Sequence, residues 1–141
     1  MAVDALGELH DALKQDRYSG HQLEVFLVRL LFCLFADDTG IFQPKDSFHD
    51  LIEFHTHDDG SNVGAMLDTL FVTLNKDFDK RQDALAEKFA LFPYVNGLLF
   101  EERIEPPSFT AAMRTQLLTL AKRSWGNISP AIFGAMFQRV I

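Results

Sequence analysis

Residues 21–40 read HQLEVFLVRLLFCLFADDTG, and this stretch decides the fold. From Val25 to Ala36 only Arg29 is charged, and every other side chain is apolar. A helix that is apolar on nearly all sides is central and buried. We therefore predict a central helix over His21–Ala36, with Arg29 on its one polar stripe. Ser19, followed three residues later by a glutamine, has the form of a capping box that would start this helix.

Four residues follow that predict the end of the helix: Asp37, Asp38, Thr39 and Gly40. Glycine adopts positive φ readily, so Gly40 is the expected left-handed residue after the helix. Aspartate side chains bind backbone N–H groups in turns. We therefore expect a structural turn in which Asp37 or Asp38 accepts hydrogen bonds from backbone or arginine groups.

Helical spacing of apolar side chains predicts further helices on both sides of the central one. Their approximate ranges are 3–15, 48–54, 63–74, 80–90, 109–120 and 130–137. The expected N-caps are Asp46 or Ser47 for the second of these, Ser108 for the fifth and Ser129 for the last. The sequence thus predicts an all-α fold, a compact bundle of about seven helices that forms a single domain over residues 1–141.

Residues 91–107 differ from the rest because Pro93, Pro106 and Pro107 exclude a continuous helix. Asn96-Gly97 between short apolar runs is a signal for a tight hairpin turn. The segment is expected to form either a small β-ribbon or an ordered loop.

Composition excludes several functional classes. The chain has 141 residues, 48% hydrophobic and 23% charged, which is typical of a globular domain. A net charge of −7 argues against a free-standing nucleic-acid-binding protein. Cys33 is the only cysteine and lies in an apolar run, so it is expected to be buried and unreactive. With no signal peptide and no membrane-length apolar run, a cytoplasmic protein is expected.

One cluster has the residue types of a metal site: His55, His57, Asp58 and Asp59. A small metal-dependent hydrolase using these residues is the alternative hypothesis, although such a site needs further ligands from elsewhere. A solvated loop is the favoured interpretation. The chain has no glycine-rich phosphate loop and no Gly-x-Ser-x-Gly nucleophile motif. We therefore assign no catalytic, cofactor-binding or metal-binding residue.

Four basic residues near the C-terminal end are weak candidates for contacts with DNA phosphates, although scattered surface charge is the favoured interpretation. They are Arg114, Lys122, Arg123 and Arg139.

Several strings resemble a known family: FADDTGIF at residues 35–42, FPYVNG at 92–97 and ISPAIFG at 128–134. In this order they resemble the helical spacer of type IIG/IIL single-chain bacterial restriction-modification enzymes, the adenine-N6 DNA methyltransferases. The resemblance implies a nuclease domain before the spacer, and methyltransferase and target-recognition domains after it. These neighbouring domains would be the partners of this chain, and the parent enzyme would bind DNA.

The family's methyl-transfer motif Asn-Pro-Pro-Tyr and its cofactor loop are absent from this sequence. The resemblance therefore implies a non-catalytic spacer without cofactor, and S-adenosylmethionine is expected only in the parent enzyme. A spacer of this kind would position the nuclease relative to the methyltransferase.

The C-terminal helix and the segment Tyr94–Phe100 are the expected docking side for the neighbouring domain. The named candidates are Tyr94, Phe100, Phe133 and Phe137. Large exposed apolar patches usually mark a missing partner. The isolated chain could hide such a patch by self-association.

Overall fold

The computed structural model describes residues 2–95 and 97–126, and within these ranges it contains helices and no β-strand. The α-helices are α1 (Ala2–Gln15), α2 (His21–Thr39), α3 (Ser47–His55), α4 (Val63–Leu74), α5 (Glu87–Ala90) and α6 (Ala111–Ala121), and η1 (Phe78–Lys80) is a 3₁₀-helix. The all-α prediction is confirmed. The seventh predicted helix, with Phe133, Phe137 and Arg139, lies outside the described residues.

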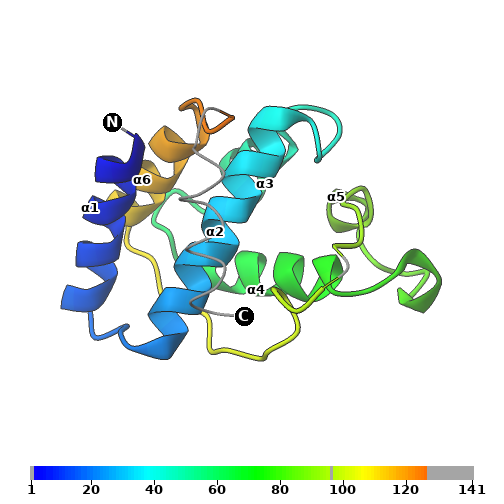
Figure 1. Cartoon of the computed structure of the whole chain (residues 1–141), viewed down its shortest axis with the longest axis horizontal. Helices are drawn as coiled ribbons and strands as arrows, with labels where there is room; N and C mark the ends of the chain where they lie inside the picture. The colour runs from blue at the N-terminus through cyan, green and yellow to red at the C-terminus, as the bar shows by residue number, and fades with distance from the viewer. Residues whose placement is uncertain (1, 96, 127–141) are drawn as a thin grey trace.

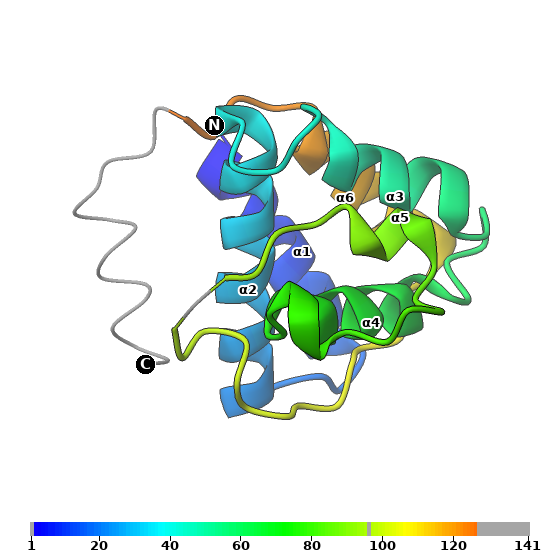
Figure 2. The same cartoon turned by 90° about the vertical axis from the view of Figure 1, so that its right-hand side faces the viewer.

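α2 is the centre of the bundle (Figures 1 and 2). α1 and α6 lie side by side next to it, and α3 contacts both α2 and α6. Twelve of the nineteen residues of α2 are buried, among them Phe26 and Val28, which point to opposite sides of the helix. Cys33 is fully buried, and burial raises the pKa of its thiol well above the ordinary value. A helix this apolar is stable only when other helices cover it on most sides.

The ends of α2 differ from the prediction. The helix continues past Ala36 to Thr39. Gly40 then takes φ 83°, which confirms the predicted left-handed residue after the helix. The N-cap is Gly20 with φ 73°, not Ser19, and no side chain caps the first turn. The predicted capping box is therefore wrong.

α6 also begins later than predicted. Its N-cap is Thr110, whose hydroxyl accepts a hydrogen bond from the backbone N–H of Met113 at 3.2 Å. Ser108, the predicted cap, lies two residues before this position, and Phe109 is buried ahead of the helix.

The predicted helix over residues 80–90 is wrong. Only η1 and the four-residue α5 form there, separated by residues 81–86. The Arg81 guanidinium donates hydrogen bonds to carbonyl oxygens on both sides of this gap, those of Thr73 at 2.9 Å and Phe92 at 2.8 Å. The Arg81 guanidinium thus holds two distant parts of the chain together. A continuous helix over residues 80–90 could not place both carbonyl oxygens within reach of this one side chain.

Residues 91–110 form an ordered loop in their described part. Phe92 and Phe100 are buried, and Phe92 stacks edge-on against Phe42 at 5.0 Å between ring centroids. The Tyr18 hydroxyl donates to the carbonyl of Glu105 at 2.5 Å, and burial raises the pKa of Tyr18 to about 12. Asn96 lies outside the described residues, while Gly97 has φ 140°.

The loop then crosses the start of α4 at very close range. A Cβ added at Gly64 would lie 2.0 Å from the carbonyl oxygen of Pro107. Only a glycine permits this approach, so the end of the loop packs directly against the α4 backbone.

None of the helices in the described parts of the chain is long and apolar enough to cross a membrane.

Candidate functional site

Arg29 is buried in the core and anchors the irregular segment to α2. It is only 3% exposed, which corrects the expectation that it lies on a polar stripe. Its Nε donates to the carbonyl of Leu99 at 2.8 Å, and its Nη2 donates to the carbonyl of Glu102 at 2.6 Å. The rings of Phe71 and Phe100 each lie 5.7 Å from the guanidinium carbon. Burial lowers the pKa of Arg29, and the two carbonyls and two rings compensate the charge.

Asp37 lies in the last turn of α2 and caps α3 from a distance. Its two carboxylate oxygens accept hydrogen bonds from the backbone N–H groups of Phe48 at 2.9 Å and His49 at 3.2 Å. The residue before α3, Asp46, makes no side-chain cap. Asp37 is 2% exposed, and burial raises the pKa of its carboxyl above the ordinary value. The start of α3 is therefore fixed to the end of α2.

Asp38 makes the equivalent connection to the segment after α6. One of its oxygens accepts hydrogen bonds from the backbone N–H groups of Trp125 at 3.0 Å and Gly126 at 2.8 Å. Trp125 is fully buried. Together, Asp37 and Asp38 join three parts of the chain at one end of α2. We call these two residues the aspartate clamp.

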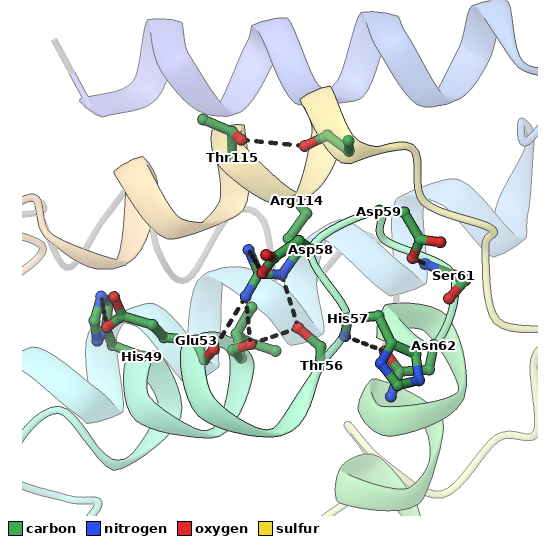
Figure 3. A network of polar contacts seen from close by, with 12 residues as sticks. His49, Glu53, Thr56, His57, Asp58, Asp59, Ser61, Asn62, Arg114 and Thr115 are labelled. Carbon is green, nitrogen blue, oxygen red and sulfur yellow. Dashed lines mark hydrogen bonds and ion pairs between the residues drawn. The ribbon is translucent and has the colours of Figure 1, made fainter.

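Arg114 is buried between α6 and α3 (Figure 3), which corrects its assignment as a phosphate-contact candidate. Its guanidinium donates to the hydroxyl of Thr56 at 2.9 Å and to the carbonyl of Glu53 at 3.0 Å. These groups lie at the C-terminal end of α3, where carbonyls lack helical partners. Lys122 and Arg123 remain exposed, and Arg139 lies outside the described residues.

The metal-like cluster forms a turn rather than a site. The backbone N–H of His57 donates to Asn62 Oδ1 at 2.7 Å, and the N–H of Ser61 donates to Asp59 Oδ1 at 2.9 Å (Figure 3). This second hydrogen bond lowers the pKa of Asp59. Asp58 extends toward Arg114, with 3.6 Å between its Oδ1 and a guanidinium nitrogen.

The candidate ligands His55, His57, Asp58 and Asp59 are thus not gathered around one point. Within residues 2–95 and 97–126, the side chains that do lie close enough together to share a metal ion are those of His49, Asp50 and Glu53. The hydrolase hypothesis has no geometric support.

An apolar groove between α3 and α5 could receive a partner. Its volume is about 490 Å³. Its lining residues are Pro44, Ser47, Asp50, Leu51, Phe54, His55, Ala86, Glu87, Lys88 and Leu91. Phe54 is 70% exposed and Leu91 43%, which is unusual for large apolar side chains. The sequence pattern placed Phe54 on the buried face of its helix and so missed this groove.

The second exposed apolar region belongs to the predicted docking segment. Leu98 is 59% exposed and Tyr94 37%. Phe100 is 4% exposed and packs on Arg29, which corrects its assignment as a docking residue. Phe133 and Phe137 lie outside the described residues.

A family model described as MmeI, helicase spacer domain, matches residues 21–100. The chain belongs to this spacer-domain family. The match includes the buried α2, the aspartate clamp and the first part of the loop that Arg29 anchors. It confirms the predicted membership in the spacers of type IIG/IIL restriction-modification enzymes.

Two individual proteins are similar to this spacer domain over almost its whole length. It is 36% identical to DNA methyltransferase A of Bacillus subtilis (strain 168), a match that covers 99% of this chain and 16% of the methyltransferase. It superposes with a TM-score of 0.89 and 51% identity on MmeI, a type IIL restriction-modification enzyme solved in complex with DNA. That match covers 99% of this chain and 19% of the MmeI chain. The spacer domain thus spans less than a fifth of either relative.

Proposed function

We propose that this spacer domain holds the nuclease of a larger bacterial enzyme at a fixed position relative to its S-adenosylmethionine-dependent adenine-N6 methyltransferase domain. The aspartate clamp carries the proposal. It ties α2, α3 and the segment after α6 together through four hydrogen bonds to backbone N–H groups. The two hydrogen bonds to Asp37 are buried, whereas those to Asp38 are part-buried and exposed. Hydrogen bonds to a charged acceptor are stronger than neutral ones, so in this proposal the three parts move as one unit.

A rigid unit is what the positioning of two working domains requires. Domains joined by small polar interfaces move relative to one another by default. A spacer suppresses such motion only if it does not bend internally. Arg29 and Arg114 add to the rigidity because each is buried and binds carbonyl oxygens of a second segment.

The positioning role is tested by a distance measurement in the complete enzyme. Spin labels on the two flanking domains should give one narrow distance distribution. Replacing both clamp residues (Asp37→Ala with Asp38→Ala) should broaden it. The exposed pair Asp79→Ala with Asp83→Ala removes the same charge and serves as the matched control. A distribution that is already broad in the unchanged enzyme, or that stays equally narrow in a folded clamp variant, contradicts the proposal.

The domain contributes no catalytic group or cofactor of its own in this proposal. S-adenosylmethionine belongs to the parent enzyme's methyltransferase domain. The isolated 141-residue chain should show no saturable heat of binding with S-adenosylmethionine in calorimetry. Saturable binding would contradict this part of the proposal.

The neighbouring domains dock on exposed apolar surface in this proposal. The groove with Phe54 and Leu91 and the segment with Tyr94 and Leu98 are the described candidates, and Phe133 and Phe137 remain candidates beyond them. Lys122 and Arg123, together with Arg139, are the remaining candidates for contacts with DNA phosphates within the parent enzyme. The isolated chain could self-associate through the uncovered surface.

Hydrogen–deuterium exchange can locate the docked surface. Amides of α3 and α5 in the complete enzyme should exchange more slowly than in the isolated chain. Amides of residues 30–34 in the centre of α2, which are away from the groove, are the internal control. Equal exchange at the groove in both samples would place the neighbouring domain elsewhere.

A further inference from the structure

The histidine in the first turn of α3 has its ring between the carboxylates of Asp50 and Glu53. Figure 3 shows His49 beside Glu53. His49 is 9% exposed. Its Nδ1 lies 3.1 Å from Oδ1 of Asp50, and its Nε2 lies 3.4 Å from Oε2 of Glu53. Ligand atoms of all three side chains lie within 4.8 Å of one another.

The two sides of the ring are not equivalent. Nδ1 is within hydrogen-bond distance of Asp50, and because a carboxylate oxygen can only accept, we take the tautomer in which Nδ1 carries the proton. Nε2 of the neutral ring then presents a lone pair. This atom is buried and has no hydrogen-bond partner. Its lone pair faces the negative carboxylate of Glu53, an arrangement that is unfavourable unless a positive charge lies between them.

The separation of 3.4 Å between Nε2 and Oε2 leaves two candidates for this positive charge, a proton on Nε2 and a metal ion. A charge-assisted hydrogen bond is usually shorter, about 2.7–2.9 Å, although Arg114 and Asp58 form an ion pair at 3.6 Å in the same structure. Two ligands of a tetrahedral zinc ion, at about 2.0–2.1 Å from the metal, are about 3.3–3.4 Å apart. The observed separation is compatible with one edge of a zinc coordination tetrahedron, and the titration below distinguishes a bound ion from a protonated ring.

We propose that His49 Nε2 and the Glu53 carboxylate bind a divalent zinc-type metal ion, with Asp50 as the residue that positions the ring. A carboxylate that holds the non-ligating N–H is the usual partner of a metal-bound histidine. Water completes the coordination shell on the exposed side, where Glu53 is 41% exposed. This site is distinct from the turn at residues 55–59.

The surroundings of the site fit a cation. Among the residues that the structure describes, no lysine or arginine forms an ion pair with Asp50 or Glu53, and Arg114 pairs with Asp58 instead. The backbone N–H of His49 is held by Asp37, so the ligands start from a fixed helical turn. The inference does not depend on the proposed positioning role.

Calorimetric titration of the metal-free 141-residue chain with Zn²⁺ tests the site. One saturable site is expected. Glu53→Gln should weaken binding about tenfold or more, because loss of a ligand costs at least as much as loss of an outer-shell partner. Asp50→Asn should weaken it less, and Co²⁺ in the same site should give the intense visible absorption of tetrahedral coordination.

His55→Gln and His57→Gln are the matched histidine controls, and both should leave zinc affinity unchanged. The exposed pair His21 and Glu102, 2.9 Å apart, is a further control, tested with His21→Gln. The proposal is overturned if the chain shows no saturable zinc binding, or if a control variant removes it while Glu53→Gln does not. A His49 ring that NMR shows doubly protonated in the presence of zinc would also overturn it.

Discussion

Two regions of the domain are fixed by opposite chemistry. One is the C-terminal end of α2. The other is the segment of residues 75–91, which holds η1 and α5 and which we call the arm. At the end of α2, two carboxylates accept hydrogen bonds from backbone N–H groups. In the arm, one guanidinium, that of Arg81, donates to backbone carbonyls. The first region is buried with Asp37 at 2% exposure, whereas the arm has Phe78 at 59%.

This difference shows what apolar packing adds to hydrogen bonding. At the end of α2, Asp37 lies against the core, so we expect its separation from α3 to require unfolding of much of the domain. The arm lies at the far end of α4 from α1 (Figure 1) and is held mainly by its own hydrogen bonds. Segments with few buried apolar contacts open locally, at a free energy below that of global unfolding.

The largest expected effect comes from a cavity in α2. Leu30→Ala should lower the free energy of unfolding by about 2–5 kcal/mol, because Leu30 is fully buried and its neighbours cannot fill the space. Phe78→Ala in the arm should cost less than about 1 kcal/mol, since that ring mainly covers the Arg81 guanidinium. Urea denaturation of both variants measures the contrast, and equal losses would remove the distinction between the two regions.

The next effect concerns the N-terminal end of α4, the helix that joins the arm to the core. Gly64→Ala should lower the free energy of unfolding by about 1–3 kcal/mol, because its Cβ would strike the Pro107 carbonyl and force the backbone to shift. Gly7→Ala is the matched control in α1, where a Cβ meets no atom within 4 Å. It should gain about 0.5–1 kcal/mol from helix propensity. Thermal unfolding of the pair should shift the midpoints in opposite directions.

A smaller and more local effect is expected in the arm itself. Arg81→Gln leaves the carbonyls of Thr73, Ala90 and Phe92 without their donor and should weaken the arm by about 1–2 kcal/mol. Each 1.4 kcal/mol speeds local exchange about tenfold. Amides of Phe89–Phe92 should therefore exchange faster while those of α2 keep their rates. Faster exchange in α2 as well would mean that the arm and the core open together.

The smallest effect is a pH dependence at Asp37. Burial raises the pKa of the Asp37 carboxyl in the folded state above its ordinary value of 3.8. At pH values between the ordinary and the raised pKa, the folded chain therefore binds this proton more tightly than the unfolded chain does. Stability from this group thus increases as the pH falls through this window. An asparagine side chain cannot titrate, so the deficit in unfolding free energy of Asp37→Asn relative to the unchanged protein should grow as the pH falls. Urea denaturation at a series of pH values measures this deficit, and one that shrinks would show that the folded pKa is lowered instead.

Local sequence signals predicted the helices that bury a continuous apolar face. α2 and α4 are clear examples, because their apolar residues recur over several turns. The same spacing failed at residues 80–90, since Leu85 and Phe89 are periodic while Arg81 gathers distant carbonyls. The sequence indicated that Asp37 or Asp38 would bind backbone groups, but not which groups, because Phe48 and Trp125 reach them only through tertiary packing.

The candidate sites were harder to predict for the same reason. Arg29 and Arg114 are charged and therefore looked like surface residues, yet both are buried against carbonyl groups. The spacing of His49 and Glu53, four residues apart on one helix, was a usable signal. The His55–Asp59 cluster is denser in ligand types and therefore dominates the sequence pattern.

The aspartate clamp also has a consequence for the order of folding. Two negative charges in the last turn of a helix oppose its macrodipole, so this turn of α2 is disfavoured while the chain is still extended. It becomes favourable only when the N–H groups of Phe48 and Trp125 arrive. The last turn of α2 should therefore form late, in the same cooperative step that docks α3 and the segment after α6.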